Sequence, residues 1–307
     1  MKKQILALSA FILIISFSAC KKDTSANTSN NDAEIAAHSD DESQFSSELD
    51  NIIDEGNIAL ESNTGFSGRL QSPQEVFCDA TTVVDTTSNP RTITITYDGS
   101  GCTPGRTRTG AIKISMAQGV QWKNAGAAVT VTFQNVKITR TRDNKSVTIN
   151  GTQTYTNVSG GLLFNLYTLG SITHRISSNN LSLSFNDGSQ RNWQVDKQRV
   201  FTFDNGYVIT TTGLHTEGNI TGVAEWGTNR FGNAFTTAIT SPLIVREDCD
   251  FRLTSGAVQH KTNLFTATVT FGLDATGNPT ACPTGNYYFK AEWTGMNGNG
   301  SSIILPY

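Results

Sequence analysis

The side chains that could carry acid–base chemistry in this chain are few and scattered. They include four histidines, His38, His174, His215 and His260. No Gly-x-Ser-x-Gly elbow, His-Glu-x-x-His helix or glycine-rich phosphate loop accompanies them, although triad hydrolases, zinc proteases and nucleotide enzymes carry such patterns. We therefore expect the histidines on solvated strands, no catalytic residue and no cofactor.

Carboxylates are the remaining route to an enzyme, because a glycosidase needs two carboxyl groups about 5 to 10 Å apart across one cleft. The candidates are Glu217, Glu225, Glu247 and Glu292. Neighbouring residues on a strand point to opposite faces, so the tryptophan that follows Glu225 or Glu292 cannot flank it. The pattern favours exposed glutamates on strands over an active site.

Tryptophans suggest a different kind of site. The chain has four of them, Trp122, Trp193, Trp226 and Trp293. Aromatic rings on an open sheet face stack on the apolar faces of sugar rings, whereas a tryptophan between sheets fills the core and buries a large area. The sequence leaves both roles open and makes a glycan a candidate ligand.

The N-terminus carries an export signal that ends at a cysteine. Two lysines precede an apolar run from Ile5 to Phe17, and a small-residue cleavage site ends at Cys20. Residues 17–20, Phe-Ser-Ala-Cys, resemble the lipobox of bacterial lipoproteins. The resemblance implies that residues 1–19 are a signal peptide that is removed, and that Cys20 is diacylated and becomes the mature N-terminus. Two or three acyl chains, at about 0.8 kcal/mol per buried methylene, hold a protein on a membrane essentially permanently.

The residue after Cys20 predicts the destination. It is Lys21 and not aspartate, which by analogy with known sorting rules favours the outer membrane over retention in an inner membrane. We therefore expect an outer membrane lipoprotein, at the cell surface or on the periplasmic face, whose membrane partner is reached through the lipid anchor.

Residues 20–69 are expected to form a flexible acidic tether. Acidic residues accumulate up to Glu55 among Ser, Asn and Ala, a composition that buries too little apolar surface to fold alone. Within this segment, Leu49, Ile52 and Ile53 repeat at helical spacing. They predict a short amphipathic helix that ends at Gly56 and either docks on the folded body or frays.

From about Val76 onward the sequence has a period of two. Apolar residues alternate with Thr or Ser at 92–97, 129–133, 181–185 and 265–271. Each run predicts a half-buried strand. Turn pairs separate the runs, among them Asp98-Gly99, Asn150-Gly151, Asp187-Gly188 and Asn205-Gly206, of which the last is the best candidate for a tight hairpin. The chain is therefore predicted to be all-β, with antiparallel sheets in a sandwich-like arrangement.

An internal repeat predicts two related β-modules, residues 70–175 and 176–307. In each, one cysteine precedes an alternating strand and a second cysteine follows in a glycine-containing turn. An even number of cysteines in an exported chain indicates disulfides. Four cysteines allow three pairings, and the repeat selects Cys78 with Cys102 and Cys249 with Cys282.

Spacing and composition exclude several other partners. Neither His215 nor His260 lies within four residues of a cysteine, and no Cys-x-x-Cys pair occurs, so zinc is not expected. Asp248 and Asp250 lack the loop pattern of a calcium site. A net charge of -3 without a basic block excludes nucleic acid. After the N-terminal segment, no apolar run is long enough to span a membrane.

Four stretches, together with the lipobox, resemble uncharacterised cell-envelope lipoproteins of Bacteroidota. They are TITYDGSGCTPGRTRTGAIKI, VTINGTQTYTN, NRFGNAFTTAITSPLIVREDC and SGAVQHKTNLFTATVTFG. The resemblance covers nearly the whole chain and implies location and fold class, but it transfers no catalytic or ligand residue. We expect an outer-membrane-anchored binding or structural module, with a glycan or an envelope protein as partner. The alternative is a carbohydrate-acting accessory protein or glycosidase at the cell surface.

Overall fold

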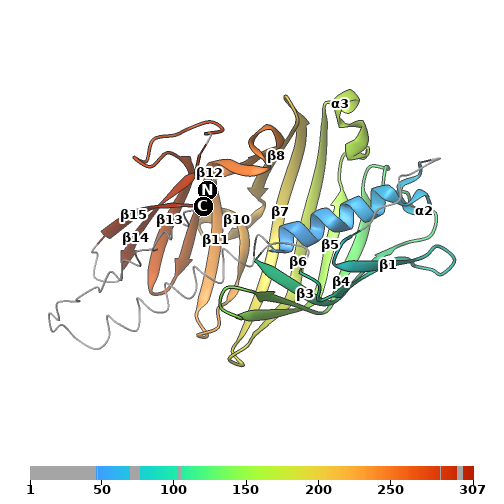
Figure 1. Ribbon diagram of the computed structural model, residues 1–307, viewed down its shortest axis with the longest axis horizontal. Helices are drawn as coiled ribbons and strands as arrows, with labels where there is room; N and C mark the ends of the chain where they lie inside the picture. The colour runs from blue at the N-terminus through green and yellow to red at the C-terminus, as the bar shows by residue number, and fades with distance from the viewer. Residues whose placement is uncertain (1–45, 47, 70–76, 102–104, 284, 296–299) are drawn as a thin grey trace, which may run out of the picture.

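The computed structural model describes residues 46, 48–69, 77–101, 105–283, 285–295 and 300–307 (Figure 1). An N-terminal helix covers residues 48–62, and short helical turns follow at α2 (Thr64–Ser67), η1 (Leu163–Asn165), α3 (Leu166–Leu169) and η2 (Glu247–Cys249). The strands are β1 (Ala80–Asp85), β2 (Arg91–Asp98), β3 (Arg106–Met116), β4 (Ala127–Arg140), β5 (Ser146–Asn157), β6 (Ser171–Phe185), β7 (Gln190–Phe203), β8 (Tyr207–Gly213), β9 (His215–Glu217), β10 (Ile220–Thr228), β11 (Ala234–Arg246), β12 (Arg252–Thr262), β13 (Phe265–Leu273), β14 (Tyr288–Gly295) and β15 (Gly300–Pro306).

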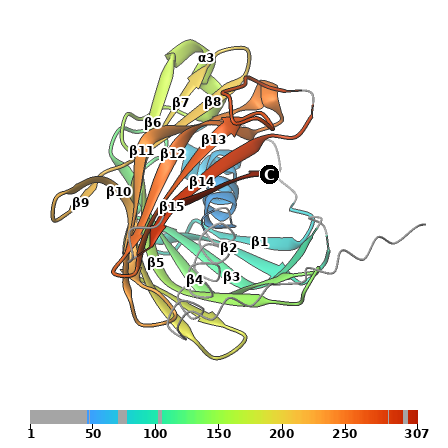
Figure 2. The same cartoon turned by 90° about the vertical axis from the view of Figure 1, so that its left-hand side faces the viewer.

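All of these strands belong to one antiparallel sheet. Their order follows the chain from β1 to β7 and continues from β10 to β15, while β8 pairs with β7 and β11, and β9 pairs with β10. The predicted all-β, antiparallel fold class is therefore confirmed. Within the described part of the chain, the sheet does not stack on a second sheet. It curves around the N-terminal helix instead (Figure 2).

The hairpin predicted at Asn205-Gly206 is confirmed. Phe203 of β7 lies opposite Tyr207 of β8. Asn205 and Gly206 both have positive φ, 54° and 135°, which reverses the chain in a three-residue loop. Asparagine and glycine tolerate that backbone region better than other residues, so the local sequence determines this turn.

The turn predicted at Asn150-Gly151 is wrong, because both residues lie inside β5. Gly151 has a φ of 115°, and a Cβ there would collide with the carbonyl oxygen of Asn180 on β6. Gly110 on β3 makes a similar close approach to Asn135 on β4. Pairing registers shift beside these residues. Such bulges bend a sheet without ending its strands.

The N-terminal helix lies on the concave side of the sheet (Figures 1 and 2). Leu49, Ile52 and Ile53 are buried and form one core with inward-facing residues of β2 to β7. The predicted stop at Gly56 is wrong, because the helix continues to residue 62. Gly56 faces Ile114 of β3, and a Cβ there would lie 3.4 Å from the end of that side chain, an ordinary van der Waals contact.

The expected module boundary between residues 175 and 176 falls inside β6. That strand pairs with β5 on one side and β7 on the other, so the sheet is continuous across the boundary. Of the expected tether, residues 48–62 form the buried helix, whereas residues 20–45 lie outside the described part. The relationship between the two modules stays a prediction.

Candidate functional site: an open groove on the C-terminal strands

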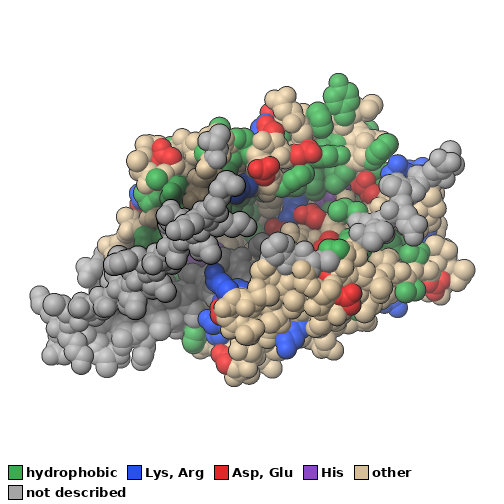
Figure 3. All heavy atoms as spheres, in the orientation of Figure 1, with side chains coloured by type: hydrophobic (Ala, Val, Ile, Leu, Met, Phe, Trp, Pro, Cys, Tyr) green, Lys and Arg blue, Asp and Glu red, His purple; other side chains and the backbone are tan. Residues whose placement is uncertain are grey.

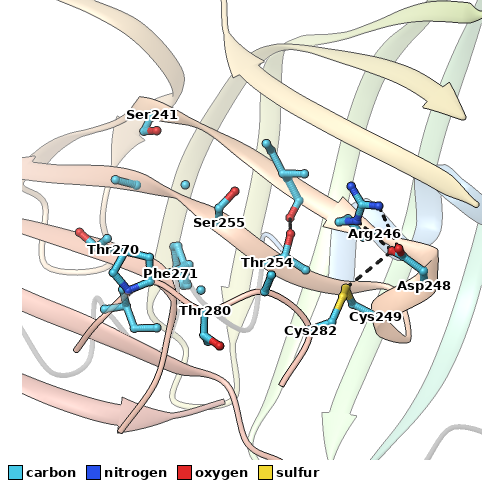
Figure 4. Close-up of a pocket in the computed structure, with 17 residues that line it drawn as sticks. Ser241, Arg246, Asp248, Cys249, Thr254, Ser255, Thr270, Phe271, Thr280 and Cys282 are labelled. Carbon is cyan, nitrogen blue, oxygen red and sulfur yellow. Dashed lines mark hydrogen bonds and ion pairs between the residues drawn. A yellow bond between two sulfur atoms is a disulfide. The ribbon is translucent and has the colours of Figure 1, made fainter. Parts of the chain in front are cut away.

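An open groove of about 740 Å3 lies on the C-terminal part of the sheet (Figure 4). It is formed by β11, β12, β13 and the loop that follows β13. Its lining includes the hydroxyl groups of Ser241, Ser255, Thr270 and Thr280 and the aromatic ring of Phe271. Most of the accessible lining is apolar carbon, with a few neutral hydrogen-bonding groups in it.

Two glycines shape the groove. Gly256 on β12 and Gly272 on β13 have φ values of 124° and 76°, and both lack room for a side chain because backbone carbonyls of the neighbouring strands approach them. Pairing registers shift beside both glycines. The strands bend there, as expected of glycine within a sheet.

A disulfide forms one wall of the groove. Cys249 and Cys282 are bonded, with their Cα atoms 5.1 Å apart, which confirms that predicted pair. The bridge ties the loop after β13 to η2, and the Thr280 N–H donates to the Gly272 carbonyl at 2.8 Å, which fixes the same loop. The predicted bridge between Cys78 and Cys102 stays a prediction, because Cys102 lies outside the described residues.

The charged side chains that line the groove compensate each other. Arg246 donates from Nε and Nη2 to the two carboxylate oxygens of Asp248, at 2.8 and 2.9 Å. It also donates to Asp204 at 3.1 Å. Hydrogen bonds from Arg246 hold the pKa of Asp248 below its ordinary value. The groove is therefore suited to an uncharged ligand.

Asp248, Cys249 and Cys282 place their potential ligand atoms within 4.8 Å of one another. Metal binding by cysteine requires a thiolate, and both sulfur atoms are used in the disulfide. Within this cluster, the Asp248 carboxylate is therefore the one group that remains able to bind a metal ion.

The glutamates considered as a catalytic pair lie apart, and each has a partner elsewhere. The partners are Ser46 and Lys197 for Glu225, His215 for Glu217, the Tyr207 N–H for Glu247 and Lys290 for Glu292. Of the described residues that line the groove, Asp248 is the one carboxylate. Among the described residues, the groove is thus a surface lined by a single carboxylate.

His174 differs from the expected solvated strand histidine, because it is completely buried. Its Nδ1 lies 2.6 Å from the Tyr155 hydroxyl. Burial, with a contribution from the charge of Arg199, lowers the pKa of His174 to about 3, so the ring is neutral at pH 7. Among the other histidines, His215 and His260 lie on half-buried strand positions, and His38 is outside the described residues.

The tryptophans do not form a row on the surface. Trp122 and Trp193 are fully buried in the core. Trp226 is half-buried and stacks on His215, with ring centroids 3.9 Å apart. Trp293 is also half-buried, and neither lines the groove. The core role is therefore confirmed for the first two, and the aromatic ring at the groove comes from Phe271.

A second polar site, which was not among the sequence-based predictions, joins the N-terminal helix to the sheet. Acidic residues of the helix pair with basic residues that point inward from β3 and β7. The pairs are Glu48–Arg106, Glu55–Arg108, Asp50–Lys197, Asp50–Arg199 and Asp54–Arg199. Figure 3 shows red and blue side chains exposed in the hollow beside the helix. We call this set the helix–sheet ion pairs.

Burial and ion pairing act in opposite directions on these carboxyl groups. Burial raises the pKa of Glu48 despite its pair with Arg106. For Asp50, burial is outweighed by the charges of Arg199 and Lys197, so its pKa is lowered. Burial prevails at Asp54 and raises its pKa. The network therefore contains compensated charges whose burial opposes their pairing, so its net contribution to stability is smaller than the number of ion pairs suggests.

The sequence did hold a signal for these ion pairs. Arg106 and Arg108, like Lys197 and Arg199, are two residues apart on strands, so each pair points to one face. The apolar neighbours with the same parity, such as Ile112 and Val195, place that face inside. Basic residues at inward positions require acidic partners. The acidic residues of the predicted tether were the candidates for these partners.

Comparisons of this chain with protein-family models, curated proteins and solved structures found no significant match. In the described residues, no helix has both the length and the apolar character needed to cross a membrane.

Proposed function

We propose that this chain is an exported lipoprotein of a bacterial outer membrane, and that its curved sheet is an extracytoplasmic binding module. The lipobox-like residues 17–20 and Lys21 support the anchor and the destination. The Cys249–Cys282 disulfide is consistent with an oxidising compartment outside the cytoplasm.

The ligand that best fits is an uncharged molecule with many hydroxyl groups, such as a neutral oligosaccharide. The observation that carries this proposal is the groove, whose lining combines Ser241 and Thr270 with Phe271 on the alternate positions of the sheet, and where Arg246 is neutralised by Asp248. Sugars present hydroxyl groups at their edges and C–H groups on their faces, which matches hydroxyls beside an aromatic ring. Binding sites combine apolar surface and a few polar groups in this way.

Replacing Phe271 by alanine is expected to weaken the binding of a neutral oligosaccharide by about two- to tenfold, because the loss of an aromatic contact costs about 0.5–1.5 kcal/mol. A panel of neutral and acidic oligosaccharides is first titrated against the whole protein by calorimetry, and the best ligand is then used with the variant. Phe251→Ala is the matched control, because Phe251 is exposed and does not line the groove. Equal effects of the two substitutions, or no binding of any neutral glycan, would contradict the proposed ligand.

Replacing Cys20 by alanine is expected to abolish incorporation of labelled palmitate and to move the protein from the membrane fraction to the soluble fraction. The reason is that the acyl chains on this residue supply the membrane affinity. The measurement is metabolic labelling with fractionation of cells that express either form. Equal labelling of both forms, or none of the wild type, would exclude the anchor and leave the groove proposal unaffected.

A further inference from the structure

In the part of the chain that the structure describes, the sheet is open, and its two outermost strands each pair with one neighbouring strand. These strands are β1 and β15. An unpaired strand edge presents backbone N–H and C=O groups that can bind another strand, and natural proteins protect such edges with charges, bulges or covering elements. The two edges of this sheet differ in that protection.

The β15 edge is unprotected. Its seven residues, Gly300–Pro306, contain no charged side chain. Ile303 and Leu305 are 44% and 41% exposed. The strand pairs with β14 from Gly300 to Pro306 without a register shift, so the edge is regular. The one residue in it that lacks an N–H, Pro306, is at the end of the strand.

The β1 edge is shorter and more polar. It has six residues and ends at Asp85, whose carboxylate accepts hydrogen bonds from Thr87 and Ser88 in the following turn. The side-chain amide of Gln118 donates to the carbonyl oxygens of Thr86 and Ser88. The chain after β1 is therefore closed into a turn and cannot extend the edge.

We propose that β15 is an interface between two copies of this chain, which pair their β15 strands antiparallel about a two-fold axis at Ile303. This arrangement joins two sheets edge to edge. The proposal does not depend on the ligand of the groove.

The sequence of β15 is suited to pairing with itself. With Ile303 on the axis, Ser302 lies opposite Ile304 and Ser301 lies opposite Leu305. The axis is perpendicular to the sheet, so the same face of both copies points the same way. Ile303 lies opposite Ala291 of β14, and the row Ala291–Ile303 of one copy would therefore continue as an apolar row into the other, flanked by Leu305 opposite a serine.

Charge and symmetry favour a second copy over other occupants. Like charges opposite each other destabilise a strand pair, and β15 has none. Pairing of β15 with itself closes after two copies, whereas pairing of β15 with β1 would be open-ended and would form fibres. Of these two pairings, the pairing of β15 with itself is thus the one that gives a finite assembly.

The C-terminal residue holds β15 in place before any partner arrives. The Tyr307 N–H donates to the Tyr287 carbonyl at 2.9 Å. Its hydroxyl accepts from the Gly272 N–H at 3.1 Å and donates to the Leu253 carbonyl. An edge that is already ordered loses less conformational entropy on binding.

The first test introduces thiols at the two edges of the whole mature protein in detergent. Ile303→Cys places two thiols across the axis, about 5 Å apart by the spacing of paired strand residues. Val83→Cys is the matched control, because Val83 is an exposed apolar residue on β1. A short bis-thiol reagent is expected to cross-link the Ile303→Cys protein into dimers and to leave the Val83→Cys protein monomeric. Equal cross-linking of both would overturn the proposal.

The second test needs no reagent. Sedimentation of the wild-type protein in detergent is expected to show a monomer–dimer equilibrium. Ile303→Lys places two ammonium groups beside the axis and is expected to weaken self-association by roughly tenfold or more, whereas Val83→Lys leaves it unchanged. Circular dichroism checks that both variants are folded. A wild-type protein that stays monomeric at every concentration, or dimers that survive Ile303→Lys unchanged, would rule out this interface.

Discussion

Replacing Arg108 by alanine is expected to lower the free energy of unfolding by about 3–5 kcal/mol, the usual cost of removing one partner from a buried ion pair. Arg108 is 2% exposed and donates from Nε and Nη2 to both oxygens of Asp79, each at 2.8 Å. It also pairs with Glu55 of the helix at 2.8 Å and lies over the Tyr97 ring. Without it, the Asp79 carboxylate remains buried and uncompensated.

The chain contains a matched control for this substitution. Arg175 also donates from Nε and Nη2 to both oxygens of an aspartate, Asp196, at 2.8 Å each. Its side chain, however, is 49% exposed. Exposed pairs contribute about 0–1 kcal/mol, so Arg175→Ala is expected to cost less than about 1 kcal/mol. Urea unfolding of the three proteins measures the difference. Similar losses for the two variants would mean that burial does not decide the value of these pairs.

Removing the Cys249–Cys282 bridge is expected to cost about 3–4 kcal/mol. The two cysteines are 33 residues apart, and closing a loop of that length in the unfolded chain corresponds to this free energy in the chain-entropy model. The loop contains β12 and β13. Its release should therefore also loosen the groove and reduce ligand binding.

Thermal melts of the Cys249→Ala, Cys282→Ala double variant and of the wild type, each with and without reductant, measure this effect. We expect reductant to destabilise the wild type and to shift the double variant less, because the latter has already lost this bridge. Identical melting temperatures of the wild type with and without reductant would show that the bridge does not stabilise the folded state.

Local sequence predicted the strands well, because the alternation of Thr or Ser with apolar residues is itself the physical cause of a half-buried strand. The hairpin at Asn205-Gly206 followed from backbone preferences of the same two residues. Asn150-Gly151 has the same composition but forms a bulge, since the strands on either side, β4 and β6, continue past it. Nothing within the dipeptide distinguishes a turn from a bulge. Whether the chain turns or continues depends on whether the neighbouring strands extend past the dipeptide.

The site was predictable only in part. The disulfide beside the groove followed from the repeat, whereas the groove itself depends on bends at Gly256 and Gly272 within neighbouring strands, which the alternation pattern does not indicate. The helix was predicted from Leu49, Ile52 and Ile53, with docking on the folded body as one of two alternatives, but the ion pairs that join it to the sheet were not predicted. From its composition alone, the acidic segment is predicted to be exposed to solvent. The partners that bring part of it inside are basic residues that point inward from strands far along the chain.

The position of the N-terminal helix has a consequence for the order of folding. Its Asp50 and Asp54 bind Lys197 and Arg199, which are 147 and 145 residues further along the chain. Contacts between residues so far apart in sequence form slowly, and the interior cannot close until β7 has been synthesised. Late closure keeps the chain extended for longer, which would suit the export that we propose, because an exported chain passes through a narrow channel before it acquires its shape.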